Sequence, residues 1–156
     1  MNMPRSAVAH LLGLSRNTVA AHIRRAEQAL GRDLADVHSR AAVHLALALS
    51  SSGAGPEPDD YQPVPSLDHL LSTERAAVWS RATLRPLDAR HRRTLQAWID
   101  ADTDARQAAC RMGVSRNTVR AHLRTAEALL GLDLLTTGTG IHEVVHALHI
   151  TNARAV

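Results

Sequence analysis

Apolar residues recur at helical spacing in two widely separated parts of the chain. In each part four of them fall at i, i+4, i+7 and i+11, which places them on one face of a helix. A serine precedes each stripe in the position of an N-cap, and a glycine follows it where helices end. The sequence therefore predicts helices over 15–31 and 115–131. The two stripes are Val19, Ile23, Ala26 and Leu30, and Val119, Leu123, Ala126 and Leu130.

Shorter helices are predicted on both sides of each stripe. They cover 4–12 and 40–49 around the first stripe, and 104–112 and 141–150 around the second. Two further helices precede the second stripe only. These are predicted over 73–84 and 86–101, with Leu87, Leu95 and Trp98 as the expected buried face of the latter. Either the chain continues upstream of residue 1, or the first part takes its missing packing from the rest of the chain.

The two parts are copies of one unit. Residues 13–34 and 113–134 are identical at fifteen of twenty-two positions, and the similarity resumes at Val43-His44 and Val145-His146 after a two-residue slip. A stretch of Gly, Ser, Pro and acidic residues separates them, which is typical of a linker. We predict an all-α fold of two tandem helix-turn-helix units, each of three to five helices. The division is 1–50, a Pro/Gly/acidic linker over 51–65, and 66–156.

Composition agrees with helices and points to an anionic partner. Apolar residues make up 45% of the 156 residues and aromatic residues only 2%, so the core must be built from aliphatic side chains. All eighteen basic residues are Arg, and the net charge is +3. Residues 1–50 carry six Arg and three acids, and 76–156 carry eleven Arg and seven acids. Both units are basic, which weakly favours an anionic partner.

Several classes of protein are disfavoured. Cys110 is the single cysteine, which excludes a disulfide framework, and we expect it to be a small core filler. No apolar run approaches the ~20 residues of a membrane span, and the first residues lack an apolar signal region, so we expect a cytoplasmic, nucleoid-associated protein. The sequence has no phosphate-binding loop and no nucleophile elbow, so no enzymatic activity is expected.

Three histidines near the C-terminus are the one candidate metal site. His142, His146 and His149 share a helical face, a spacing that can hold a metal ion. Matching acidic or cysteine ligands are not obvious, and the corresponding helix of the first unit keeps only His44. We expect packed histidines and neither a metal nor a cofactor.

A short helix, a turn containing Gly and a longer helix form the plan of a helix-turn-helix. In such a motif the capped N-terminus of the second helix suits a phosphate or a base edge. An Arg or Asn there can bond guanine or adenine, while a second Arg two turns on suits phosphates. The predicted DNA-binding residues are Ser15, Arg16, Asn17, Thr18, Ala20 and Arg24, and Ser115, Arg116, Asn117, Thr118, Arg120 and Arg124.

The run from Arg116 to Leu134, which ends in Gly-Leu-Asp-Leu, resembles the C-terminal helix-turn-helix domain of PucR-family bacterial regulators. The resemblance extends over roughly 85–156 and 4–50. It implies a Fis-like DNA-binding domain, reading helices at 15–31 and 115–131, and a separate sensory region upstream. The Thr-Val-x-Ala-His-Leu-Arg core is also similar to LuxR-type output domains, but the Gly-Leu-Asp-Leu continuation favours PucR. Ala20 stands where the second unit has Arg120, so the first unit is expected to bind more weakly.

The sequence thus predicts a sequence-specific transcriptional regulator, or its DNA-binding fragment, that binds double-stranded DNA. The shared Ser-Arg-Asn-Thr-Val predicts two similar half-sites, with an inverted arrangement favoured and a direct repeat left open. A homodimer, or a missing N-terminal sensory region, is a further expected partner. The alternative is a helix-turn-helix-derived module for protein interaction or dimerisation that has no DNA binding of its own.

Overall fold

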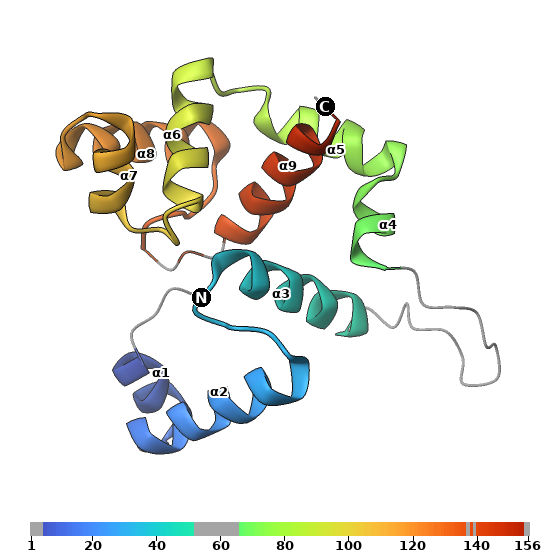
Figure 1. The fold of residues 1–156 in the computed structure, drawn as a ribbon, viewed down its shortest axis with the longest axis vertical. Coiled ribbons are helices and arrows are strands. Elements are labelled where there is room, and N and C mark those ends of the chain that lie inside the picture. Colours follow the sequence, from blue (N-terminus) through green and yellow to red (C-terminus); the bar gives the residue numbers. More distant parts are fainter. Residues whose placement is uncertain (1–4, 52–65, 137, 139, 155–156) are drawn as a thin grey trace.

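The computed structural model describes residues 5–51, 66–136, 138 and 140–154. Over these residues the fold is all helical, with nine α-helices and no strand (Figure 1). The predicted linker lies almost entirely outside the described residues, as does Pro4 of the first predicted helix. The helices are α1 (Arg5–Leu12), α2 (Arg16–Leu30), α3 (Val37–Ser51), α4 (Leu67–Leu71), α5 (Glu74–Leu84), α6 (Ala89–Ile99), α7 (Ala105–Met112), α8 (Arg116–Leu130) and α9 (Ile141–Ala153).

Side-chain caps fix where most of these helices begin. In each case a hydroxyl or carboxylate accepts a hydrogen bond from a backbone N–H two or three residues later, which satisfies a group that the helix leaves unpaired. Asp88 caps α6, so this helix begins later than the predicted boundary at 86. Asp104 caps α7, so this helix begins directly after the predicted boundary at 104. Helix α3 is longer than predicted, and α4 was not predicted. The capping residues are Ser15, Ser66, Thr73, Asp88, Asp104 and Ser115.

The second unit has a continuous aliphatic core. The predicted stripe on α8 is buried at Val119, Leu123 and Ala126, and the predicted face of α6 is buried with it. Helices α6, α7 and α8 pack on one another, and α9 lies against α5 (Figure 1). The predicted burial of the face of α6 is confirmed. The buried residues are Leu95 and Trp98 on α6 and Leu87 just before this helix.

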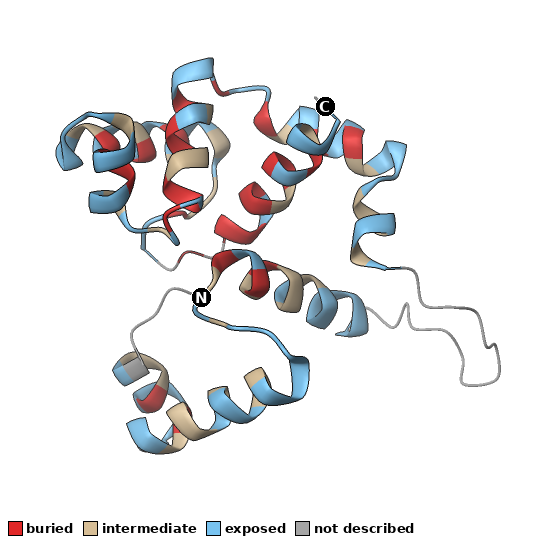
Figure 2. Ribbon diagram, in the orientation of Figure 1, coloured by how far each residue is buried: buried red, intermediate tan, exposed pale blue. Residues whose placement is uncertain are grey.

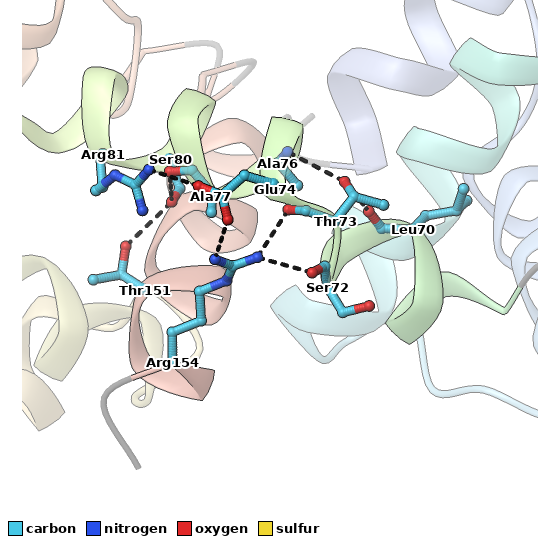
Figure 3. A network of polar contacts seen from close by, with 10 residues as sticks. All are labelled: Leu70, Ser72, Thr73, Glu74, Ala76, Ala77, Ser80, Arg81, Thr151 and Arg154. Atoms are coloured by element: carbon cyan, nitrogen blue, oxygen red, sulfur yellow. Dashed lines mark hydrogen bonds and ion pairs between the residues drawn. The ribbon is translucent and has the colours of Figure 1, made fainter.

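A polar network fastens the end of α9 to the junction between α4 and α5 (Figure 3). Arg154 follows α9, and its guanidinium contacts the Glu74 carboxylate at 2.7 Å. The same guanidinium donates to the backbone carbonyls of Ser72 and Thr73 at 2.9 and 3.1 Å. Glu74 also pairs with Arg81 at 3.0 Å, and these contacts lower the pKa of the Glu74 carboxyl. The network therefore holds α5 in register along α9.

Helix α3 belongs to the first unit by sequence, yet it packs on α9 of the second. Its buried residues Val37 and Ala41 join the same apolar cluster as α6, α8 and α9. The N-terminus of α3 is also held from the second unit, because the Asp102 carboxylate accepts a hydrogen bond from the N–H of Val37 at 3.2 Å. The first unit thus takes packing from the rest of the chain through its closing helix.

The contact between α3 and α9 is close to self-complementary. In the repeat, His44 corresponds to His146. The His44 ring lies 4.6 Å from the ring of His142, which corresponds to position 40. In return, Nε2 of His146 is 3.1 Å from the carbonyl oxygen of Ala41. Each of these two histidines therefore contacts the other closing helix about one turn before the position that corresponds to its own. Such a reciprocal arrangement is typical of an isologous contact between two protomers.

One residue of the apolar stripe on α2 is exposed, and one expectation about burial is wrong. Leu30 completes the apolar stripe of α2, but it is 49% exposed because no helix of the described part covers that end of α2. Cys110 is exposed and not a core filler. Its neighbours Ala108 and Ala109 face the core, and the helical turn directs the next position outward.

His142 makes the α3–α9 contact sensitive to acid. The ring is only 4% exposed, and its nitrogens have no hydrogen-bond partner among the described residues. Burial, with the nearby His44 and Arg40 adding, lowers its pKa from 6.5 to about 4. Below about pH 6.5 the His142 ring of the unfolded chain binds a proton, whereas the His142 ring of the folded chain stays neutral until about pH 4. The stabilisation by neutral His142 is therefore complete above pH 6.5 and is lost as the pH falls to 4.

We expect His142→Leu to flatten the dependence of stability on pH between 6.5 and 4, by up to roughly 3 kcal/mol in unfolding free energy. Urea unfolding at a series of pH values measures this. His149→Gln on the exposed side of α9 is the matched control and should keep the wild-type slope. Equal slopes for wild type and His142→Leu would show that the buried ring is not responsible.

Candidate nucleic-acid interface

The two turns between the paired helices have the same construction. Gly13 follows α1 with φ +64°, and Gly113 follows α7 with φ +66°. This left-handed backbone costs glycine little and other residues more. The chain then closes in the same way, since the N–H of Leu14 donates to Ala9 at 2.9 Å and that of Val114 donates to Ala109 at 3.1 Å. The sequence prediction of a helix-turn-helix in each unit is therefore confirmed in backbone geometry.

The predicted caps at the start of α2 and α8 are also confirmed. The hydroxyl of Ser15 accepts from the N–H of Thr18 at 3.1 Å, and that of Ser115 accepts from Thr118 at 3.0 Å. In both units the Ser and Thr hydroxyls are also 2.8 Å apart. The threonine hydroxyls therefore take a local role in the cap. The serine and threonine hold the helix end in place, and the side chains between them project into solvent.

Three arginines form a basic stripe along α8. Arg116, Arg120 and Arg124 lie four residues apart, so they share one face of the helix. All three are exposed, as is Asn117, while the apolar stripe of the same helix is buried. The reading residues predicted in the second unit therefore lie together on the solvent side. We call Arg116, Asn117, Arg120 and Arg124 the reading face of α8.

The first unit presents a weaker copy of this face on α2. Arg16, Asn17 and Arg24 are exposed in the same positions. Ala20 takes the place of the middle arginine and is half-buried. The first unit therefore carries two arginines along the stripe where the second carries three.

A surface hollow lies beside the first turn of α8. Arg116 and Arg120 line one part of it, and Asp102, Asp104 and Arg106 line another. The pKa of Asp104 is lowered, chiefly because the N–H groups of Gln107 and Arg106 bond its carboxylate, and the Arg106 and Arg116 charges add to this. An ionised carboxylate next to Arg116 reduces the positive potential there and disfavours a phosphate directly beside it.

Sequence reasoning did not identify Arg106. It is exposed near the start of α7, the helix that precedes the reading helix. In helix-turn-helix proteins this first helix crosses the DNA backbone. The sequence carried one signal for Arg106. Its counterpart in the first unit is Ser6, so the two units differ in charge at this position.

His122 lies away from the reading face. Its Nδ1 is 3.0 Å from the hydroxyl of Thr94 on α6, and its ring meets that of His91. Burial lowers the pKa of His122, with the Arg90 charge adding to the effect. The corresponding His22 is exposed on α2.

The three C-terminal histidines are separated by the packing. His142 is buried, His146 meets α3, and His149 is exposed. Among the described residues no group of three or more His, Cys, Asp or Glu side chains is arranged to hold a metal ion. Nor does the described part contain a helix whose length and apolar character suit a membrane span.

A family model for the PucR C-terminal helix-turn-helix domain matches the chain in two segments, 2–49 and 91–150. Together the segments cover more than half of the chain. The second segment includes most of α6, for which the first has no counterpart. No curated protein and no solved structure matches the chain.

We expect Ser115→Ala to lower the unfolding free energy by about 1 kcal/mol, because an alanine leaves the N–H of Thr118 without its acceptor. Thermal or urea unfolding measures the loss. Ser52→Ala, a serine outside both motifs, is the control. A Ser115→Ala protein as stable as the control would mean that water replaces the cap without cost.

Proposed function

The chain belongs to the family of PucR C-terminal helix-turn-helix domains, and on that basis we propose that it is a sequence-specific DNA-binding transcription regulator with two reading units. The units are 1–50 and 66–156, and their reading helices are α2 and α8. The observation that carries the proposal is the pair of exposed Arg-Asn faces at capped helix starts. This family is one of DNA-binding domains and not of enzymes, and DNA binding implies association with the nucleoid.

The residues of the reading face differ in the part of the DNA that they are placed to contact. Arg116 at the first turn is placed to bond the edge of a guanine in the major groove, and Asn117 to bond an adenine. Arg120 and Arg124 lie one and two turns further and are placed for phosphates. Ser115 and Thr118 act by holding the helix end, from which Arg116 and Asn117 project. In the first unit Arg16, Asn17 and Arg24 take the same roles, and Ser15 and Thr18 the same support.

The half-sites are expected to be inverted. The closing helices α3 and α9 meet in a nearly self-complementary way, through His44 on one side and His146 on the other. Two units related by an approximate two-fold axis fit two half-sites related by the same symmetry. Because Ala20 removes one phosphate contact, the half-site bound by α2 should contribute less of the affinity.

Selection of bound sequences from a random DNA library, with the whole chain at near-physiological salt, tests this proposal. We expect enrichment of two related half-sites in inverted orientation, about one DNA turn apart. A single enriched half-site would restrict reading to α8, and a direct repeat would overturn the two-fold arrangement. No enrichment would overturn sequence-specific binding by this chain.

We expect Arg116→Ala to weaken binding to the selected site by about 1–3 kcal/mol and to relax base preference at one position. Arg124→Ala should weaken binding to all sequences alike and reduce the slope of affinity against salt by about one. Fluorescence anisotropy over a range of salt concentrations measures both. Arg75→Ala, an exposed arginine on α5, is the matched control.

A second function is favoured by a separate observation. Several leucines of the first unit are exposed, among them Leu11, Leu12 and Leu47, and exposed apolar residues can mark a protein-binding surface. A module that only docks to other proteins would show little DNA affinity at about 100 mM salt and no steep dependence on salt. The anisotropy series therefore separates the two functions.

A further inference from the structure

The α1–α2 hairpin has an apolar face that nothing in the described structure covers. Helices α1 and α2 pack on each other, but their apolar side remains largely exposed or half-buried (Figure 2). Leu12 is 58% exposed and Leu30 is 49% exposed. We call the following set the uncovered face: Val8, Leu12, Ile23, Ala26 and Leu30.

The second unit shows what normally occupies this position. The corresponding residues of α7 and α8 are buried or packed against the core, in a cluster that includes Leu95, Trp98 and Ile99 of α6. The cover is therefore a helix with apolar residues at i, i+3 and i+4. The covered counterparts are Ala108, Met112, Leu123, Ala126 and Leu130.

We propose that the uncovered face of α1–α2 binds an amphipathic helix of the same chemistry as α6, contributed from outside residues 1–156. This helix would present an apolar triplet to Leu12, Ile23 and Leu30. It would also bring a hydroxyl residue to His22, as α6 brings Thr94 to His122. The proposal does not depend on DNA binding.

Two observations favour this occupant over a second copy of the chain. Residues 5–34 carry five Arg and two acids, so two such hairpins placed face to face would bring like charges together. The stretch 86–103 carries three Arg and three Asp and meets the basic hairpin without that repulsion. Exchange of α6 between two copies cannot cover every such face either. Two chains contain two α6 helices but four hairpins, since each chain has α1–α2 and α7–α8.

A further part of the first unit is uncovered in the same way. Leu49 on α3 corresponds to Thr151 on α9, which meets Ser80 of α5 at 3.5 Å. No counterpart of α5 lies over α3 among the described residues, and Leu49 is exposed. The first unit therefore lacks the cover of both leading helices, so the exposed face is a property of the whole unit and not of one side chain.

A labelled peptide of residues 86–103, added to the whole chain, is the probe. We expect it to bind, measured by anisotropy, and to increase protection of α1–α2 amides in hydrogen exchange. Leu12→Ser with Leu30→Ser should weaken binding by about tenfold or more, because both remove exposed apolar anchors. Leu129→Ser, an exposed leucine of α8 outside the face, should leave binding unchanged. A peptide with Trp98→Ala and Leu95→Ala should bind weakly.

A second form of the experiment serves for the case in which the free peptide forms too little helix to bind. The same residues are joined to the N-terminus of the chain by a Gly/Ser linker, which raises the effective concentration. Protection of α1–α2 should then rise in the fusion and not in its Leu12→Ser, Leu30→Ser variant. No protection in either form overturns the proposal. Binding that the double variant does not affect places the peptide elsewhere and also overturns it.

Sedimentation of the chain alone completes the test. A concentration-dependent dimer that Leu12→Ser with Leu30→Ser abolishes, together with absence of peptide binding, would identify a second copy as the occupant and overturn the proposed helix. A monomer that binds the peptide supports it. DNA affinity enters none of these measurements, so the outcome is independent of the proposed function.

Discussion

The packing of α3 on α9 is the contact on which the relation between the two units depends. Helices α1 and α2 share little apolar surface with the rest of the described chain, whereas Val37 and Ala41 of α3 are fully inside the core of the second unit. Asp102 adds a hydrogen bond from the second unit to the first turn of α3. The first reading helix is therefore placed relative to the second through a single closing helix and the short connection that leads to it.

The two reading helices are fixed locally by the same chemistry but are supported unequally. Each begins at a serine cap after a glycine turn, and these features lie within a few residues of the helix start. The packing support differs, because α6 packs against the buried side of α8, whereas among the described residues no such helix packs against α2. The greater exposure of α2 is visible in Figure 2. Helix α2 therefore has its exposed polar side in common with α8 but much less of the burial that stabilises a helix in a protein.

A feature could be predicted from the sequence where residues close to it in the chain determine it. Helix positions, caps and turns depend on near neighbours, so Ser15, Gly13 and their counterparts were readable directly. The exposure of Leu30, the exposure of Cys110 and the docking of α3 depend on which distant helix lies alongside. The capping role of Asp102 on α3 joins residues sixty-five positions apart, and no local pattern marks it. Of the basic surface, Arg106 was missed because its position in the unit carries Ser6 in the other copy.

The joining of both reading helices in one chain changes how the protein can diverge. In a homodimer every substitution appears twice, so both halves of the target change together. Here Arg120 has Ala20 as its counterpart, so the two helices already differ at one position of this face. Under the proposed function, a substitution can alter the base preference of one helix while the other helix keeps its own. An asymmetric form of the proposed operator can then arise by single substitutions, because one helix keeps its contacts to the DNA while those of the other helix change.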